Sequence, residues 1–102
     1  MSGRREVRVA PSFFDRLDWL LPDERGDDGT PSATDFLLHD LAPIIDRLAD
    51  DYEGSTVDVP GAPRVRVLLA GGTMVPFVAV YATLADDDGI DIIDVGLDRR
   101  GR

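Results

Sequence analysis

The chain has 102 residues, the length of one typical domain, so we expect a single domain over residues 1–102. Its hydrophobic content of 43% argues against disorder, the absence of cysteine excludes disulfides and cysteine-held metals, and no apolar run is long enough to span a membrane. Twenty acidic residues face eleven basic ones, all arginine, for a net charge of −9. Phosphate backbones repel such a chain unless its arginines gather on one surface.

The first part of the chain predicts a strand followed by a helix. Residues 6–10 alternate between polar and apolar, as a half-buried strand does. Ser12 and Asp15 have the spacing of a capping box, which predicts a helix over 12–21 with one apolar stripe. Trp19 falls outside that stripe. The residues before the strand lack the apolar core of a secretory signal, so we expect a cytoplasmic protein.

A second helix is predicted over residues 33–53. Ser32 and Asp35 repeat the capping-box spacing, and apolar residues then recur at helical intervals until Gly54, a good terminator. Pro43 lies inside this helix. Because proline lacks a backbone N–H and crowds the preceding turn, we expect a kink or a split there.

Beyond the second helix the apolar period changes from 3.6 to 2, which indicates strands. A short strand is predicted at 57–59, followed by three long strands within 63–96. Gly71–Gly72 and the acidic segment 86–89 mark the turns between the long strands. Pro76 lies within the middle long strand, which we therefore place at a sheet edge or a bulge.

This order predicts an α+β fold, a two-layer sandwich in which strand–helix–helix is followed by an antiparallel β-meander. If each of the two helices reverses the chain, the first strand runs antiparallel to the first and last long strands of the meander. It can then extend the sheet at either end.

The order of elements resembles the RelE/ParE toxin superfamily of bacterial toxin–antitoxin systems. The matching stretches are Arg64-Val65-Arg66, Gly71-Gly72, Val80-Tyr81, Asp86 to Gly89, and Val95-Gly96-Leu97-Asp98-Arg99. The resemblance implies a RelE/ParE-like fold in which the first strand lies beside the last. It also implies a toxin with a cognate antitoxin as partner, acting on the ribosome and its mRNA or on DNA gyrase.

For an mRNA-cleaving member we assign catalytic roles to Arg66, Tyr81 and Arg99 and nucleic-acid binding to Arg64 and Arg100. Two arginines on one strand face can hold a phosphate, a tyrosine can stack on a base or donate a proton, and a further arginine can offset charge on the phosphate. Such an endoribonuclease would need neither metal nor cofactor. The hypothesis groups Arg64, Arg66, Tyr81 and Arg99 on the open face of the sheet.

Each of these residues also has a structural interpretation. Arg64 and Arg66 fit a solvated strand face whose arginines pair with acidic residues. Tyr81 fits an aromatic residue packed within the sheet, and Arg99 and Arg100 fit a solvated tail. Whether the protein is an enzyme therefore stays open at this point.

Two other functions compete with the nuclease. Leu97 stands where the family has histidine, and no lysine is present, which favours a non-catalytic protein-binding module related to gyrase inhibitors or to a degenerate toxin. Trp19 would then anchor a partner, or it packs against the loop 22–31. The third hypothesis is an acidic inhibitor that imitates nucleic acid. The single His39 is expected to be exposed, and Asp86–Asp88 form a hairpin tip, so no metal site is predicted.

Overall fold

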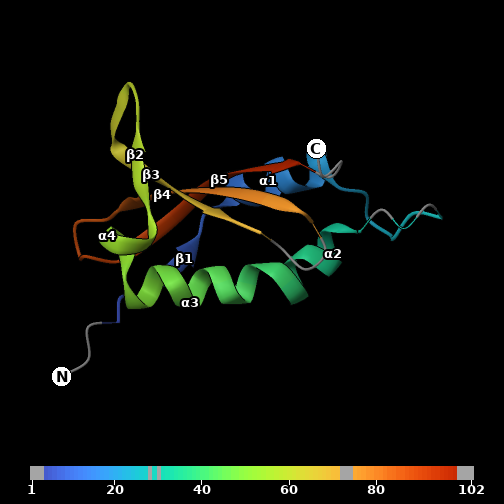
Figure 1. The fold of residues 1–102 in the computed structure, drawn as a ribbon, viewed down its shortest axis with the longest axis horizontal. Coiled ribbons are helices and arrows are strands. Elements are labelled where there is room, and N and C mark those ends of the chain that lie inside the picture. Colours follow the sequence, from blue (N-terminus) through green and yellow to red (C-terminus); the bar gives the residue numbers. More distant parts are fainter. Residues whose placement is uncertain (1–3, 28, 30, 72–74, 99–102) are drawn as a thin grey trace.

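The computed structural model describes residues 4–27, 29, 31–71 and 75–98, and it has an α+β fold with a five-stranded mixed sheet in the order β1-β5-β4-β3-β2 (Figure 1). The strands are β1 (Val7–Val9), β2 (Val57–Val59), β3 (Ala62–Ala70), β4 (Phe77–Leu84) and β5 (Ile90–Asp98). The helical elements are α1 (Pro11–Leu20), α2 (Ala33–Asp35), the π-helix η1 (Phe36–Leu41), α3 (Ala42–Asp50) and α4 (Tyr52–Ser55). None of the helices in these ranges has the length and hydrophobicity that a bilayer-spanning segment requires.

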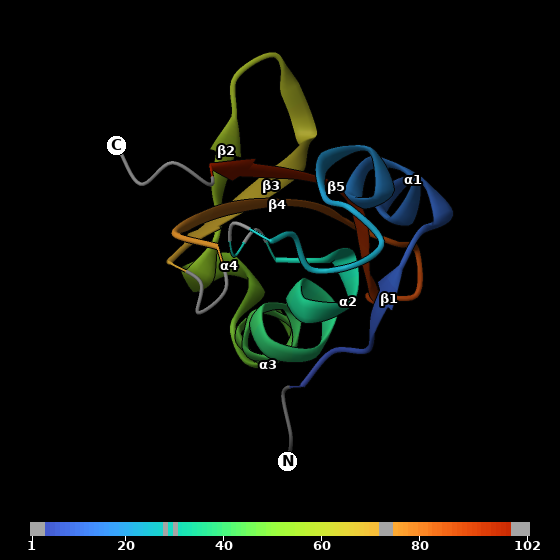
Figure 2. The same cartoon turned by 90° about the vertical axis from the view of Figure 1, so that its right-hand side faces the viewer.

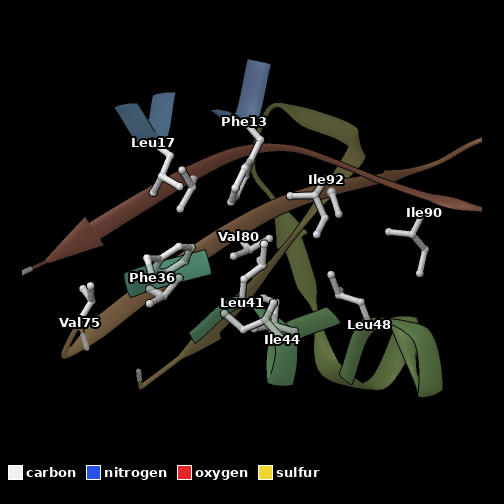
Figure 3. Packing of buried hydrophobic residues seen from close by; sticks show 14 of the residues in the cluster. Phe13, Leu17, Phe36, Leu41, Ile44, Leu48, Val75, Val80, Ile90 and Ile92 are labelled. Atoms are coloured by element: carbon white, nitrogen blue, oxygen red, sulfur yellow. The ribbon is translucent and has the colours of Figure 1, made fainter. Parts of the chain in front are cut away.

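The hydrophobic core lies between the helices and one face of the sheet (Figure 3). The fully buried side chains include Phe13, Leu17, Phe36 and Leu48 from the helices and Leu68, Val80, Ile90 and Ile92 from the strands. The rings of Phe13 and Phe36 lie 6.5 Å apart and join α1 to the second helical region. Each such side chain contributes roughly 1.5–3 kcal/mol through its removal from water.

One of the two predicted helix starts is confirmed. Ser32 and Asp35 form a capping box, with Oγ of Ser32 accepting from the Asp35 N–H at 3.0 Å and the Asp35 carboxylate accepting from the Ser32 N–H at 2.9 Å. The start predicted at Ser12 is wrong by one residue. Helix α1 begins at Pro11, whose fixed φ suits a first helical position, so the Ser12 hydroxyl instead donates to the Ile93 carbonyl at 2.7 Å.

The kink or split predicted at Pro43 is a local change of helix type, because the backbone stays helical through Leu41 and Ala42. The chain widens into the π-helix η1 immediately before α3, and Pro43 lies in the first turn of α3. A proline N–H is not needed in a first turn, and the wider π-turn relieves the crowding that its ring imposes on the preceding residues. The predicted helix 33–53 is therefore continuous through α2, η1 and α3 and breaks at Asp51, before α4.

Strand β1 lies beside β5, as the family resemblance implied, but its predicted antiparallel direction is wrong. Val7 pairs with Ile90 and Val9 with Ile92 in a parallel register. The reason is β2, which the expected topology did not count among the sheet strands. Strand β2 runs opposite to β1, as expected of the first strand after the helices, and the β2–β3 hairpin then adds one reversal before the long strands.

The predicted edge position or bulge at Pro76 is also wrong. Strand β4 begins at Phe77, after the proline, and lies in the middle of the sheet between β3 and β5. Because the proline precedes the strand, its missing N–H costs no ladder hydrogen bond. The buried carboxylate of Asp40 holds the preceding segment by accepting from the Val75 N–H at 3.0 Å. Of the predicted Gly71–Gly72 turn, only Gly71 lies within the described residues.

Strand β5 contains a bulge that was not predicted from the sequence. Tyr81 pairs with Asp94 and Ala82 pairs with Ile92, so Ile93 is one extra residue opposite that junction. Residues Ile92 and Val95 consequently both face the core, and Asp94 points to the opposite face. The bulge thereby sets which side chains of β5 are available at the surface.

Replacing Phe36 with alanine should lower the free energy of unfolding by about 3–5 kcal/mol, because the fully buried ring leaves a cavity among core side chains. Phe14→Ala is the matched control. Its ring is 41% exposed, so its loss should cost less than about 1.5 kcal/mol. Urea unfolding followed by circular dichroism measures both. Equal losses in the two variants would contradict this packing.

Candidate functional site

Arg66 has a structural role on the face of the sheet that carries the core. It shares this face with the buried Leu68, two residues further along β3. Its Nε donates to Thr56 Oγ1 at 2.6 Å, its Nη2 to the Thr56 carbonyl at 2.9 Å, and its Nη1 to Asp58 at 2.6 Å. The guanidinium therefore ties the end of the helical region and β2 to β3, with donors on all three nitrogens already engaged.

Tyr81 lies on the opposite face of the sheet from Arg66. It pairs with Val67, whereas Arg66 pairs with the buried Ala82, and successive residues of a strand point to opposite faces. The predicted grouping of Arg64, Arg66 and Tyr81 on the open face is therefore wrong. The remaining members, Arg99 and Arg100, lie outside the described residues.

Arg64 and Arg66 do lie close together, as predicted, and line a depression of about 260 Å³ with Tyr52, Pro63, Thr83 and Leu84. The Arg64 guanidinium has no ion pair within the described part of the chain. Burial raises the pKa of the Tyr52 phenol, which stays protonated at neutral pH and does not supply a base. The described residues also contain no group of three histidine, cysteine or acidic side chains arranged to hold a metal ion.

The sheet face opposite the core is apolar, and we call it the open face. Its apolar residues are Val57, Val67, Leu69, Phe77, Ala79 and Tyr81, of which Val67 and Ala79 are buried, and Asp94 lies on the same face. The side chains of Val57, Leu69 and Phe77 are 53%, 49% and 45% exposed. Figure 2 shows α2 and α3 on one side of β4, with the β2–β3 hairpin extending away on the other. Exposed apolar residues gathered on one face are typical of an interaction surface.

Trp19 stands beside the open face and is 77% exposed, so it is not packed against the described residues of the loop 22–31. Arg16 lies over its ring, with 5.5 Å from the guanidinium carbon to the ring centroid. Nε of Arg16 also lies 3.3 Å from the Asp94 carboxylate. Because Asp94 pairs with Tyr81 across β4 and β5, these contacts connect Trp19 to the open face. A groove of about 460 Å³ between α1 and β5 is lined by Ser12, Asp15, Arg16, Trp19, Ile93 and Asp94.

Arginines near the start of the chain hold the acidic turn between β4 and β5. Arg8 contacts Asp87 and Asp91, each at 2.9 Å, and Arg5 donates to the Asp88 carbonyl at 3.1 Å. The Arg8 guanidinium lowers the pKa of Asp87 to about 2, and the carboxylate in turn raises the pKa of Arg8. The predicted hairpin tip is confirmed, and its charges serve ion pairing.

Arg16 is the residue of the site that sequence reasoning missed. It lies three residues before Trp19 in the predicted helix, a spacing at which helical side chains meet. That spacing was a usable signal, whereas the contact with Asp94 depends on the bulge in β5.

The chain matches no protein-family model, no curated protein and no solved structure, so its relation to known families rests on the sequence resemblance alone.

Replacing Arg66 with alanine should destabilise the protein by about 1–3 kcal/mol, because the hydroxyl and the carbonyl of Thr56 lose their donor. Arg64→Ala makes the same change in charge two residues away and should cost about 0.5 kcal/mol or less. Chemical denaturation of both variants gives the comparison. If Arg66 served only in RNA cleavage and had no structural role, the Arg66→Ala variant would be as stable as the wild-type protein.

The ion pair at Asp87 should make stability depend on pH at the acid end. Its folded pKa of about 2 is below its ordinary value, so the stabilisation is present above about pH 4 and is lost as the pH falls towards 2. Arg8→Gln should therefore flatten the decline in unfolding free energy between about pH 4 and 2. Arg64→Gln is the control with the same charge change, and it should retain the wild-type slope.

Proposed function

We propose that the protein is a non-catalytic protein-binding module whose binding surface is the open face together with Trp19. The observation that carries this proposal is the group of half-exposed apolar side chains, Val57, Leu69 and Phe77, on a sheet face that α2 and α3 leave uncovered. Leu69 and Phe77 provide apolar area near the ends of two inner strands, β3 and β4, and Trp19 provides an aromatic anchor beside the sheet. Large aromatic anchors with apolar surroundings dominate the energetics of protein interfaces.

The arrangement of the arginines also supports binding over catalysis. Arg66 is engaged in structural hydrogen bonds, and Tyr81 lies on the other side of the sheet. Cleavage of RNA without a metal requires a base and a charge-stabilising group held at one phosphate. The described residues do not bring such a set together.

A two-layer, RelE/ParE-like fold is part of the same proposal. Its support is the element order read from the sequence and the position of β1 beside β5. Within that family the proposal corresponds to a toxin component that acts by binding a protein target, or to a degenerate toxin that still binds its antitoxin. The replacement of the family histidine by Leu97 agrees with this choice.

Site-specific photo-crosslinking in the native host tests the surface. A benzophenone side chain placed at position 69 or 77 should capture the same protein, because both positions lie on the open face. Position 38 is the matched control, since Leu38 is 68% exposed on η1, outside the open face. Capture of no protein at 69 and 77, or of the same proteins at 38, would contradict the proposal.

An assay of ribosome-bound mRNA tests the competing nuclease. We expect no cleavage by the wild-type protein under conditions in which an authentic mRNA-cleaving toxin is active. Cleavage that Tyr81→Phe abolishes, with the fold intact by circular dichroism, would overturn the non-catalytic proposal.

A further inference from the structure

The groove between α1 and β5 already holds a cation of the protein itself. The Arg16 guanidinium lies over the Trp19 ring and contacts the Asp94 carboxylate at 3.3 Å. The indole face and a carboxylate together form a favourable environment for a positive charge. Asp15 lines the same groove, one helical turn before Trp19, and has no ion pair within the described residues. The groove therefore contains one carboxylate, that of Asp15, in addition to the Asp94 carboxylate that Arg16 contacts.

The charge of the chain decides between classes of occupant. A second copy also carries a net charge of −9, so self-association through this face is opposed by repulsion. A phosphate backbone is opposed in the same way, and Arg16, the arginine that lines the groove, is already paired with Asp94. A basic protein surface is attracted by the net charge and by Asp15.

Resting on the proposed function, we propose that the partner presents a basic amphipathic segment. Its apolar side chains pack on the open face, and one arginine or lysine enters the groove against Trp19 and Asp15. The contacts join the two halves of the surface: Val67 pairs with Tyr81, Tyr81 pairs with Asp94, and Asp94 holds Arg16, which lies over Trp19. An amphipathic segment can contact the apolar open face with its apolar side chains and the acidic groove with its basic ones.

Two short synthetic peptides are the probes, one alternating leucine with arginine and one alternating leucine with glutamate. Binding of each labelled peptide to the full chain is followed by fluorescence anisotropy. Trp19 is the only tryptophan, so its emission reports independently whether the peptide reaches the groove. We expect the basic peptide to bind and to shift that emission, and the acidic peptide not to bind.

Variants separate the groove from net charge. Trp19→Ala should weaken binding of the basic peptide about tenfold, and Asp15→Asn about threefold. Asp23→Asn makes the same charge change at an exposed residue outside the groove and should leave the affinity unchanged. Equal weakening by Asp15→Asn and Asp23→Asn, or tight binding of the acidic peptide, would overturn the inference.

The crosslinking experiment distinguishes failure of this inference from failure of the proposed function. A partner captured at positions 69 and 77 through an acidic or uncharged segment would contradict the inference and leave the binding module standing. Specific binding of the basic peptide with no partner captured in cells would support the groove chemistry and contradict the proposed function.

Discussion

The extra residue at Ile93 determines which side of β5 belongs to the core. Without it, strict alternation from Ile92 would turn Asp94 towards the buried face and Val95 away from it. A carboxylate placed without a partner among Leu68, Val80 and the helices would cost several kcal/mol. With the bulge, Val95 is buried and Asp94 is at the surface, so one inserted residue reconciles the last strand with the core.

The same bulge organises the candidate interaction surface. The carbonyl of Ile93 accepts the Ser12 hydroxyl, which fixes the start of α1 against β5. Asp94, turned outward, then meets Arg16 from that helix, and Arg16 in turn lies over Trp19. Bulges commonly redirect a side chain at the margin of a sheet, and here the redirected carboxylate links a helix to the open face.

Local features of the fold were predictable from the sequence, and relations between distant strands were not. The Ser32 capping box, the disruption at Pro43 and the exposure of Trp19 follow from spacing along the chain. The face that Arg66 occupies depends on its pairing with Ala82, sixteen residues away and across a turn (82 − 66). Alternation alone shows which residues share a face, and pairing with neighbours is needed to show which face is buried.

The bulge in β5 is visible in the sequence as a change in the alternation of apolar residues. The apolar residues of the last strand fall at even positions as far as Ile92 and at odd positions from Val95. Such a slip in a period of two is the mark of an inserted residue. The direction of β1, by contrast, could be predicted only by knowing whether the three residues of β2 join the sheet. The apolar and polar pattern of those three residues is too short to show this.

The pairing of β1 with β5 has a consequence for how the chain reaches its structure. Among the described strands β1 pairs only with β5, and Arg8 donates to Asp91 across a separation of 83 residues. During synthesis β1 therefore has no partner strand in the sheet until β5 has left the ribosome. Closing so large a loop slows folding, and contacts of long sequence separation are typical of slowly folding domains. We therefore expect the pairing of β1 with β5 to form late in folding, although β1 precedes every other strand in the sequence.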